Sequence, residues 1–338
     1  MDAVHVVGAG GIGCAVGYAL CASGSSVLFV DADPAKIAWG RRYGVAVDTL
    51  SPLPAAFVSF DEWRPPADAV ILLCTKCYDN AAVLERIPES ATLIPVQNGF
   101  DSLLHARGHA LEGIASFVSE CLPHRTHTRI TRAGRLHFGH RLSAISYEAQ
   151  VPLCISALIQ ARHIVGRRIR VQLVADILPY KYTKLMYNAA ISPLASAAGI
   201  DNGQLLRLPG ARALFFDLLR ENHAILAGAG VSLGKVGSFH PKTVSAILRR
   251  PWLAHSLAWA FYPSLRGTYC SMSGDLPTGR TEIDYYNGHL LELAGETPCP
   301  INRRIYNQIK RMEREQLKPH VDVLHELNEE PSLVDALR

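Results

Sequence analysis

The stretch Gly8-Ala9-Gly10-Gly11-Ile12-Gly13 decides the fold of this 338-residue chain because of what surrounds it. The apolar residues 3–7 before it predict a first β-strand, and the small and apolar residues 12–22 after it predict a helix packed on a sheet. A second strand is expected over residues 26–30, and Asp31 follows it directly. A Gly-x-Gly-x-x-Gly turn between a strand and a helix, with an acid after the next strand, is typical of a dinucleotide-binding βαβ unit.

The glycines of this turn have separate tasks in such a unit. Gly8 permits the tight turn, Gly10 lets the pyrophosphate approach the backbone, and Gly13 lets the helix pack closely on the strand. An ordinary βα turn is the alternative interpretation. It explains the glycines but not the strand, helix and acid that accompany them.

The helix start and the acid predict how the cofactor is held. Gly11 and Ile12 open the helix, where unpaired N–H groups and the positive dipole end face the phosphates. Asp31 is placed to accept hydrogen bonds from the adenosine ribose, and its carboxylate would repel the 2′-phosphate of NADPH. The sequence therefore predicts an NAD(P)H site in which Asp31 favours NADH. The alternative, that Arg41, Arg42 or Lys76 reaches the phosphate and offsets Asp31, stays open.

Composition narrows the class of protein. Hydrophobic residues make up 49% and charged residues 19% of the chain, and the net charge is only +4, which predicts a globular protein with no nucleic-acid partner. The strongest apolar run, residues 69–74, is too short to span a bilayer. We expect a cytoplasmic enzyme without a targeting segment or a membrane partner.

Cysteine and histidine patterns raise the question of a metal. The eight cysteines are dispersed, so free thiols are expected. Cys74 and Cys77 have Cys-x-x-Cys spacing, but no second ligand pair accompanies them. Four histidines, at positions 124, 127, 137 and 140, lie in an expected polar hairpin around Gly134, where a solvated surface competes with a metal site. We predict no metal.

The chain as a whole predicts an α/β fold in two domains. Strands and helices alternate over the first half, so a Rossmann-type, doubly wound and mostly parallel sheet is expected for residues 1–172. Residues 126–131 and 135–139 are expected to pair as antiparallel strands at its edge. Helical patterns dominate afterwards and predict an all-helical C-terminal domain over residues 173–319. A poorly packed tail is expected for residues 320–338.

One predicted helix in the second half carries a polar stripe. Lys184, Asn188 and Ser192 follow one another at four-residue spacing and share a face of an otherwise apolar helix. Buried polar groups cost free energy unless they are paired, so the stripe indicates a functional surface. A solvent-facing stripe on an amphipathic helix is the alternative.

A second polar segment surrounds a Pro/Gly loop. Ser271 lies before the loop, and Glu282 lies where a helix begins at about Thr281, so the helix dipole favours its carboxylate. Alternatively, Glu282 and Asp284 only stabilise that helix start.

Taken together, these motifs make the chain similar to the ketopantoate reductase family over nearly its whole length. The residues that carry the resemblance are the Gly-rich turn, Thr75-Lys76, Gln97-Asn98-Gly99, Lys184 with Asn188, and Ser271-Met272, Asp275, Thr281-Glu282-Ile283-Asp284 and Asn287-Gly288.

The resemblance implies roles for the residues that match. It makes Lys184 the general acid and Glu282 a catalytic-site ligand of the substrate, with Asn188 and Ser271 as further substrate ligands. Lys76 and Asn98 would lie where cofactor and substrate meet, and Asn98 would contact both.

The residue types suit this chemistry. A hydride added to a ketone carbon leaves negative charge on the oxygen, which an ammonium stabilises and protonates. The resemblance implies reduction of a 2-keto acid, ketopantoate or a relative, to the 2-hydroxy acid, with the proton from Lys184. A D-2-hydroxyacid dehydrogenase with another substrate and a non-catalytic dinucleotide sensor are the alternatives. A homodimer is left open.

Overall fold

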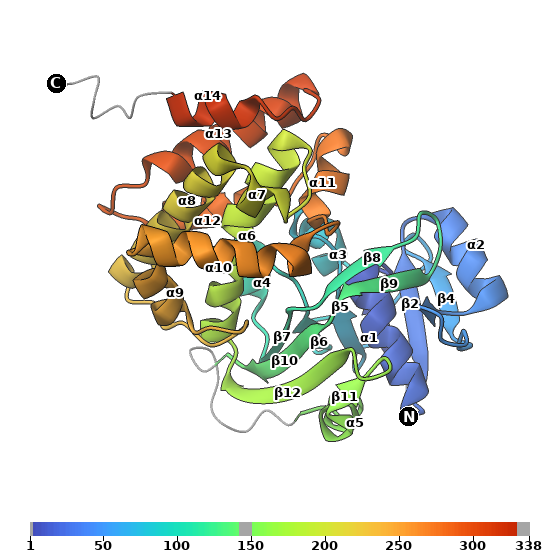
Figure 1. Cartoon of the computed structure of the whole chain (residues 1–338). Helices are drawn as coiled ribbons and strands as arrows, with labels where there is room; N and C mark the ends of the chain where they lie inside the picture. The colour runs from blue at the N-terminus through green and yellow to red at the C-terminus, as the bar shows by residue number, and fades with distance from the viewer. Residues whose placement is uncertain (1–2, 142–150, 330–338) are drawn as a thin grey trace. The chain divides into compact units, whose positions relative to one another are not determined.

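The computed structural model describes residues 3–141 and 151–329, and the chain divides into two compact units, Met1–Ile177 and Leu178–Arg338 (Figure 1). The junction expected after residue 172 falls inside a strand, Ile169–Asp176. That strand runs on because it pairs with a neighbouring strand as far as Asp176, so the division comes after it.

The first unit is built on a five-stranded parallel sheet. Its order is β4-β2-β1-β5-β6, and the helices α1, α2, α3 and α4 accompany it. The bounds are β1 Val4–Val7, α1 Gly11–Ala22, β2 Val27–Asp31, α2 Pro34–Tyr43, β4 Ala56–Ser59, β5 Val70–Leu73, η1 Cys77–Asp79, α3 Asn80–Leu84, β6 Thr92–Pro95 and α4 Ser102–Arg107. The strand order reverses at β1, and ligands of such sheets lie beyond the carboxyl ends of the strands at that point.

Alternating side chains of these strands fill two separate cores. Val6, Phe29 and Leu72 belong to the core that contains α1, whereas Val7 and Leu73 belong to the core on the other face. Because neighbouring residues of a strand point to opposite faces, both faces of the sheet are covered. The structure is therefore the doubly wound α/β fold that the sequence predicts.

Two small sheets complete the first unit. One has the order β11-β12-β10-β7 and the other β3-β9-β8, and β3, β8 and β9 pack against α1. Their bounds are β3 Ala46–Val47, β7 Leu111–Ala115, β8 Val118–Cys121, β9 His127–Arg132, β10 Gly134–His140, β11 His163–Ile164 and β12 Ile169–Asp176, with helix α5 Leu153–Ala161.

The expected antiparallel pair of residues 126–131 and 135–139 is wrong. β9 pairs with β8 and β10 pairs with β7, so the hairpin turn lies at residues 122–126 and not at Gly134. The amide of Leu122 donates to the carbonyl of His127 (2.8 Å), and His124 adopts a positive φ of 55° in this turn. Gly134 instead serves a close approach, because a Cβ there would lie 2.5 Å from the amide nitrogen of Phe117.

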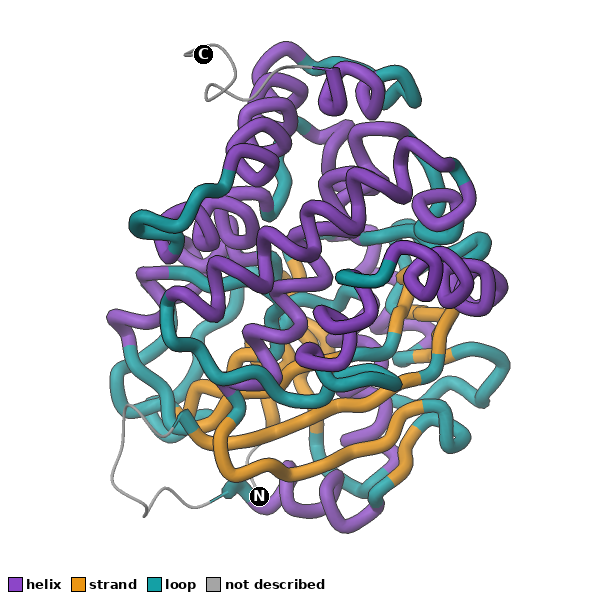
Figure 2. Tube along the Cα trace, turned by 60° about the vertical axis from the view of Figure 1, so that its left-hand side comes forward, coloured by secondary structure: helices purple, strands orange, loops and turns teal. Residues whose placement is uncertain are grey.

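The second unit contains only helices and loops among its described residues (Figure 2). The central helix α6, Leu178–Ala198, packs against α8, α11, α13 and α14. The other bounds are α7 Gln204–Arg207, α8 Pro209–Gly228, α9 Pro241–Leu248, α10 Pro251–Leu265, α11 Ser271–Asp275, η2 Leu276–Thr278, the π-helix η3 Asp284–Gly288, α12 His289–Leu293, α13 Pro300–Glu315 and α14 Val323–Glu329.

Part of the expected tail is packed. α14 buries Val323, Leu324 and Leu327 and lies against α6 and α8, so residues 323–329 correct the prediction of a poorly packed segment. Residues 330–338 lie outside the described residues. In the part of the chain that the structure describes, no helix combines the length and the apolar character needed to cross a membrane.

Candidate functional site

The Gly-rich turn has the geometry that each glycine predicts. Gly8 has a φ of 95°, a backbone conformation that residues with a Cβ atom rarely adopt. A Cβ on Gly13 would lie 1.9 Å from the carbonyl oxygen of Gly8, so helix and strand touch there. A Cβ on Gly10 would meet nothing within 4 Å, so the open side of the turn is at Gly10.

The start of α1 suits the pyrophosphate of a dinucleotide. The first intrahelical hydrogen bond runs from the amide of Cys14 to the carbonyl of Gly10 (2.9 Å), so Gly11, Ile12 and Gly13 contribute the N–H groups that precede helical bonding. Gly11 has its own steric requirement, because a Cβ there would lie 2.7 Å from Oγ of Ser119. These donors beside the open side of Gly10 fit a bound phosphate group.

Two alanine substitutions in this turn are expected to affect different properties, cofactor affinity for Gly10 and stability for Gly13. Gly10→Ala should leave the melting temperature near that of the wild type, because Gly10 has a φ of −83° and room for a methyl group. It should nevertheless weaken NADH binding about tenfold, since the methyl group occupies the side where the pyrophosphate approaches. Gly13→Ala should destabilise the first unit by about 1–3 kcal/mol. Calorimetry and cofactor titration measure both; equal melting temperatures for the two variants would contradict the steric argument.

Asp31, at the end of β2, is already engaged on both carboxylate oxygens. Oδ2 accepts from the amide of Ala9 (2.8 Å) and from Nζ of Lys36 (3.1 Å), and Oδ1 accepts from the amide of Asp33 (3.0 Å). The bond to Ala9 ties the acid to the middle of the Gly-rich turn. The partner Lys36 is a residue that the sequence did not single out.

Two thiols lie beside the same turn. Sγ of Cys14 is 3.2 Å and Sγ of Cys121 is 3.6 Å from the carbonyl oxygen of Ala9. The hydrogen bond between the two thiols and the burial of Cys14 raise the pKa of Cys14. The same hydrogen bond, together with the Lys36 ammonium, lowers the pKa of Cys121.

Lys76 and Asn98 follow the carboxyl ends of β5 and β6, and a buried amide network fixes these ends. Nε2 of Gln97 donates to the carbonyl of Thr75 (2.9 Å) and to Oδ1 of Asn80 (2.7 Å), and Nδ2 of Asn80 donates back to Oε1 of Gln97 (3.2 Å). The network links the residue before Lys76 to the residue before Asn98. Asn80 has no sequence signal of its own beyond its place at a helix start.

Asn98 carries an open acceptor. Its Oδ1 is buried and has no hydrogen-bond partner among the residues that the structure describes. A buried polar atom of this kind is costly unless a ligand or water satisfies it. The amide therefore fits a ligand with a hydrogen-bond donor at this end of the sheet, as the expected cofactor contact requires.

In the second unit, Lys184, Asn188 and Ser192 share one face of α6, as expected. The next residue on that face, Ser196, is buried, and its Oγ lies 3.2 Å from Oγ of Ser273. Sγ of Cys270 lies 3.5 Å from the carbonyl oxygen of Ser192. The stripe therefore packs against α11 at its C-terminal end, and the alternative of a wholly solvent-facing stripe is wrong.

A proline inside α6 explains why Asn287 belongs to the motif. Pro193 has no amide hydrogen, so the carbonyl of Ala189 lacks the usual helical donor. Nδ2 of Asn287 donates to that carbonyl (2.9 Å) and also to Oδ1 of Asn302 (2.9 Å). The π-helix η3 is thereby fastened to the helix that carries Lys184 and Asn188.

Removal of this fastening should cost stability. Asn287→Ala leaves the Ala189 carbonyl and Asn302 without their donor in the core, which is expected to lower the free energy of unfolding by about 1–3 kcal/mol. A denaturant titration measures the change. Asn307→Ala, on α13, is the control, because this residue lies in a surface depression, and a loss as large there would contradict the specific role of Asn287.

Glu282 is buried immediately before the helical stretch of η3. Its Oε2 accepts a hydrogen bond from the hydroxyl of Tyr286 (3.0 Å), which is also buried. The helix start is stabilised by other groups: Oε1 of Glu313 accepts from the amide and from Oγ1 of Thr281 (both 2.7 Å). Glu313 therefore supplies the hydrogen bonds that cap this helix start.

Asp284 does have the structural role of that alternative. Its carboxylate accepts from the hydroxyl of Tyr306 (2.7 Å) and pairs with Nζ of Lys310 (2.9 Å). Burial alone would lower the pKa of Lys310, but Asp284 and Glu313 together raise it, so Lys310 stays charged.

The structure thus brings together the elements that carry the expected site residues within each unit. In the second unit, α6 with Lys184 and Asn188 packs against both α11 and η3, and Ser271 is the exposed first residue of α11. In the first unit, the Gly-rich turn, Asp31, Lys76 and Asn98 all lie at carboxyl ends of parallel strands.

The residues considered for a metal do not cluster. Neither Cys74 nor Cys77 forms a disulfide with another described residue, and burial raises the pKa of Cys74 to about 12. His137 is buried in β10, and its pKa is lowered by burial to about 4, so the ring is neutral. Over residues 3–141 and 151–329, no three His, Cys, Asp or Glu side chains are grouped closely enough to hold a metal ion.

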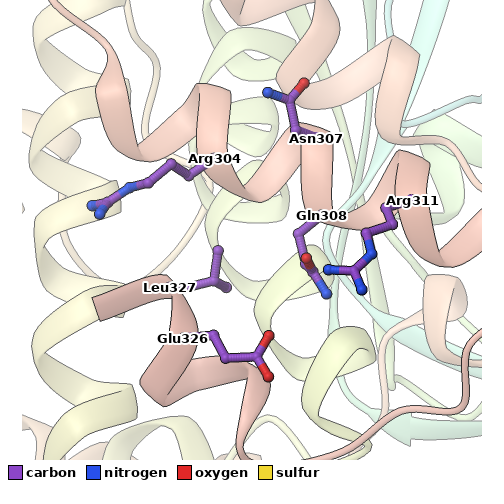
Figure 3. A pocket seen from close by; sticks show the side chains of 6 residues that line it. All are labelled: Arg304, Asn307, Gln308, Arg311, Glu326 and Leu327. Atoms are coloured by element: carbon purple, nitrogen blue, oxygen red, sulfur yellow. The ribbon is translucent and has the colours of Figure 1, made fainter. Parts of the chain in front are cut away.

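A surface depression of about 230 Å³ lies between α13 and α14 (Figure 3). It is lined by Arg304, Asn307, Gln308, Arg311, Glu326 and Leu327. None of these is an expected site residue, so the depression adds nothing to the candidate site.

Two family models match successive parts of the chain. The model described as "Ketopantoate reductase PanE/ApbA" matches residues 4–143, and the model described as "Ketopantoate reductase PanE/ApbA C terminal" matches residues 176–313. A curated 2-dehydropantoate 2-reductase of Archaeoglobus fulgidus is 23% identical over 92% of this chain and 97% of its own length. Another, of Pyrobaculum aerophilum, is 29% identical over 49% of this chain and 54% of its own length.

Solved structures share the fold. A PanE/ApbA family ketopantoate reductase from Ralstonia eutropha JMP134 has a TM-score of 0.71 and 21% identity, covering 93% of this chain and 99% of its own. D-mandelate dehydrogenase with NADH and anilino(oxo)acetate also has a TM-score of 0.71, with 17% identity over 93% of this chain and 99% of its own. The two differ in the substrates that their names state.

Proposed function

Since this chain belongs to the ketopantoate reductase family, and is therefore a nicotinamide-dependent oxidoreductase, we propose that it reduces a 2-keto acid, ketopantoate or a relative, to the 2-hydroxy acid. The observation that carries the proposal is the packing of α6, α11 and η3, which gathers the helices that carry or follow Lys184, Ser271 and Glu282. A non-catalytic sensor has no need of a general acid beside substrate ligands.

The nicotinamide cofactor, when bound, supplies the hydride that reduces the keto carbon. The residues that would hold it are Gly8 to Gly13 and Asp31 at the nucleotide end, with Lys76 and Asn98 at the carboxyl ends of β5 and β6. The open side of Gly10 and the unsatisfied Oδ1 of Asn98 support this assignment.

Lys184 is proposed to donate the proton. Negative charge develops on the carbonyl oxygen as the ketone is reduced, and an ammonium aimed at that oxygen stabilises the charge and then protonates it. Lys184 is half-buried on α6, in surroundings where the ammonium is not fully hydrated.

The remaining polar groups are proposed to hold the substrate. Ser271 is exposed at the start of α11 and can donate its hydroxyl to the substrate carboxylate. Glu282, fixed by Tyr286, can accept from a substrate hydroxyl. Asn188 lies one turn after Lys184 and can form a hydrogen bond with either the carboxylate or the hydroxyl of the substrate. Glu282 would thus select a substrate that carries a distal hydroxyl.

A different 2-keto acid is the second candidate substrate. It is favoured by the likeness to D-mandelate dehydrogenase, whose structure holds NADH with anilino(oxo)acetate. For the cofactor we propose NADH over NADPH, because Asp31 at the end of β2 is an anion and accepts one further hydrogen bond from a ribose hydroxyl.

A matrix of initial rates tests the proposal. NADH and NADPH are each combined with ketopantoate and with 2-keto acids that have aromatic or aliphatic side chains. The rate is followed as the loss of absorbance by the reduced nicotinamide. Turnover of ketopantoate with NADH supports the full proposal, and turnover of another keto acid alone supports the second candidate. Cofactor binding without turnover of any keto acid would favour the sensor.

A further inference from the structure

The hydrogen bonds that Asp31 accepts leave its carboxylate little capacity to accept further hydrogen bonds from a ligand. A carboxylate oxygen accepts about two hydrogen bonds. Among the residues that the structure describes, Ala9 and Lys36 donate to Oδ2, while Asp33 alone donates to Oδ1. One acceptor position therefore remains, and Asp31 alone cannot bind both ribose hydroxyls.

Lys36 lies where a cation does not stabilise a helix. It is in the first turn of α2, whose N-cap Asp33 accepts from the amides of Ala35 and Lys36. The helix dipole disfavours positive charge at this end. Lys36 is held there by Asp31, and only 16% of its side chain is exposed.

The ammonium of Lys36 keeps its charge and has donors to spare. Burial alone would lower the pKa of Lys36, but the neighbouring Asp31 carboxylate raises it overall. An ammonium has three N–H donors, and within residues 3–141 and 151–329 Asp31 takes one of those of Lys36. Two donors thus remain next to the carboxylate that the ribose is expected to approach.

The arginines considered as alternatives are committed elsewhere. Nε of Arg41 donates to the carbonyl of Phe57 (3.1 Å), and its guanidinium pairs with Glu62 (3.6 Å). The guanidinium of Arg42 stacks over the ring of Tyr43, 5.1 Å from its centroid. Lys36 is the cation that contacts Asp31 in the part of the chain described by the structure.

We propose that Lys36 is a second determinant of cofactor choice: its ammonium binds Asp31 while Asp31 is charged, and binds the 2′-phosphate of NADPH once that charge is removed. The proposal rests on the proposed nicotinamide-dependent function. In the wild-type protein a 2′-phosphate meets the anion Asp31 and competes with it for Lys36. Without the anion, the same ammonium forms a charge-assisted hydrogen bond with the phosphate.

A double-mutant cycle separates Lys36 from Asp31. The dissociation constants of NADH and NADPH are measured by nicotinamide fluorescence for the wild type, Asp31→Asn, Lys36→Met and the double variant. Asp31→Asn should strengthen NADPH binding about tenfold, the value of one hydrogen bond between charged groups. In the Lys36→Met background, the same substitution removes only the repulsion between Asp31 and the phosphate, so the gain in NADPH affinity should be at least about threefold smaller.

Arg42→Met provides the matched control, because it removes a charge from the same helix without touching Asp31. It should change the effect of Asp31→Asn by less than about twofold. If Asp31→Asn unfolds, Asp31→Ser replaces it in the cycle.

The outcomes distinguish this proposal from the proposed function. Equal gains in NADPH affinity with and without Lys36 would overturn the role of Lys36 while leaving the nicotinamide site intact. Failure of the folded wild type to bind either cofactor would overturn the proposed function itself.

Discussion

Lys184→Ala is expected to lower kcat by about 10²–10⁴-fold, the range for loss of a positioned general acid. Lys184 shares its helix face with Asn188, on the helix that η3 and α11 pack against. The alanine variant retains the cofactor turn in the other unit, so its dissociation constant for NADH should stay near the wild-type value. Stopped-flow measurement of a single turnover separates the chemical step from product release.

Two controls make this result specific. Lys235→Ala removes an exposed lysine of the same unit and should leave kcat unchanged. A small primary amine added to Lys184→Ala should restore part of the rate, because it can take the vacated position and donate a proton. Turnover near the wild-type value in Lys184→Ala, or an equal loss in Lys235→Ala, would remove Lys184 from the mechanism.

The first unit shows how far local sequence signals reach. The Gly-rich turn, the strands around it and Asp31 could be predicted because each depends on neighbours within one βαβ unit. The hairpin of β8 and β9 could not, because its turn contains His124 at a positive φ in place of a glycine. Gly134, which signals a turn in the sequence, instead accommodates the close backbone of Phe117.

The contacts that refine the site come from residues with no sequence signal of their own. Lys36 reads as an ordinary surface lysine of a helix, and only the structure shows its bond to Asp31. Asn80 reads as a helix start, yet it joins the ends of β5 and β6 through Gln97. Pairings of this kind depend on tertiary packing, which spacing along the chain does not reveal.

In the second unit, spacing predicted the stripe on α6 but not the reason for Asn287. The missing amide of Pro193 and the donor on Asn287 are far apart in sequence and meet only in the folded unit. The segment around Glu282 also has partners that are distant in sequence. Asp284 contacts Lys310 and Tyr306, and Thr281 contacts Glu313, and all three partners belong to α13.

Glu282→Ala is the second substitution with a large expected effect. Loss of a hydrogen bond between a charged group and the substrate costs about 1.5–3 kcal/mol, so kcat/KM should fall about 10- to 100-fold. Because Glu282 lies outside the cofactor turn, NADH affinity should stay near normal. The effect should be largest for a keto acid with a distal hydroxyl and small for an analogue that lacks it, as initial rates with the two substrates will show.

Tyr286→Phe tests whether the position of the Glu282 carboxylate matters. The hydroxyl of Tyr286 donates to Oε2 of Glu282 at 3.0 Å, and phenylalanine keeps the ring in its buried place. This variant should raise KM for the hydroxylated substrate by about tenfold at most, since one hydrogen bond of about 1 kcal/mol is lost, and should leave the analogue unaffected. In Glu282→Ala, adding Tyr286→Phe should then change nothing further. If both variants instead lose thermal stability equally and turn over both substrates alike, Glu282 only supports the helix start.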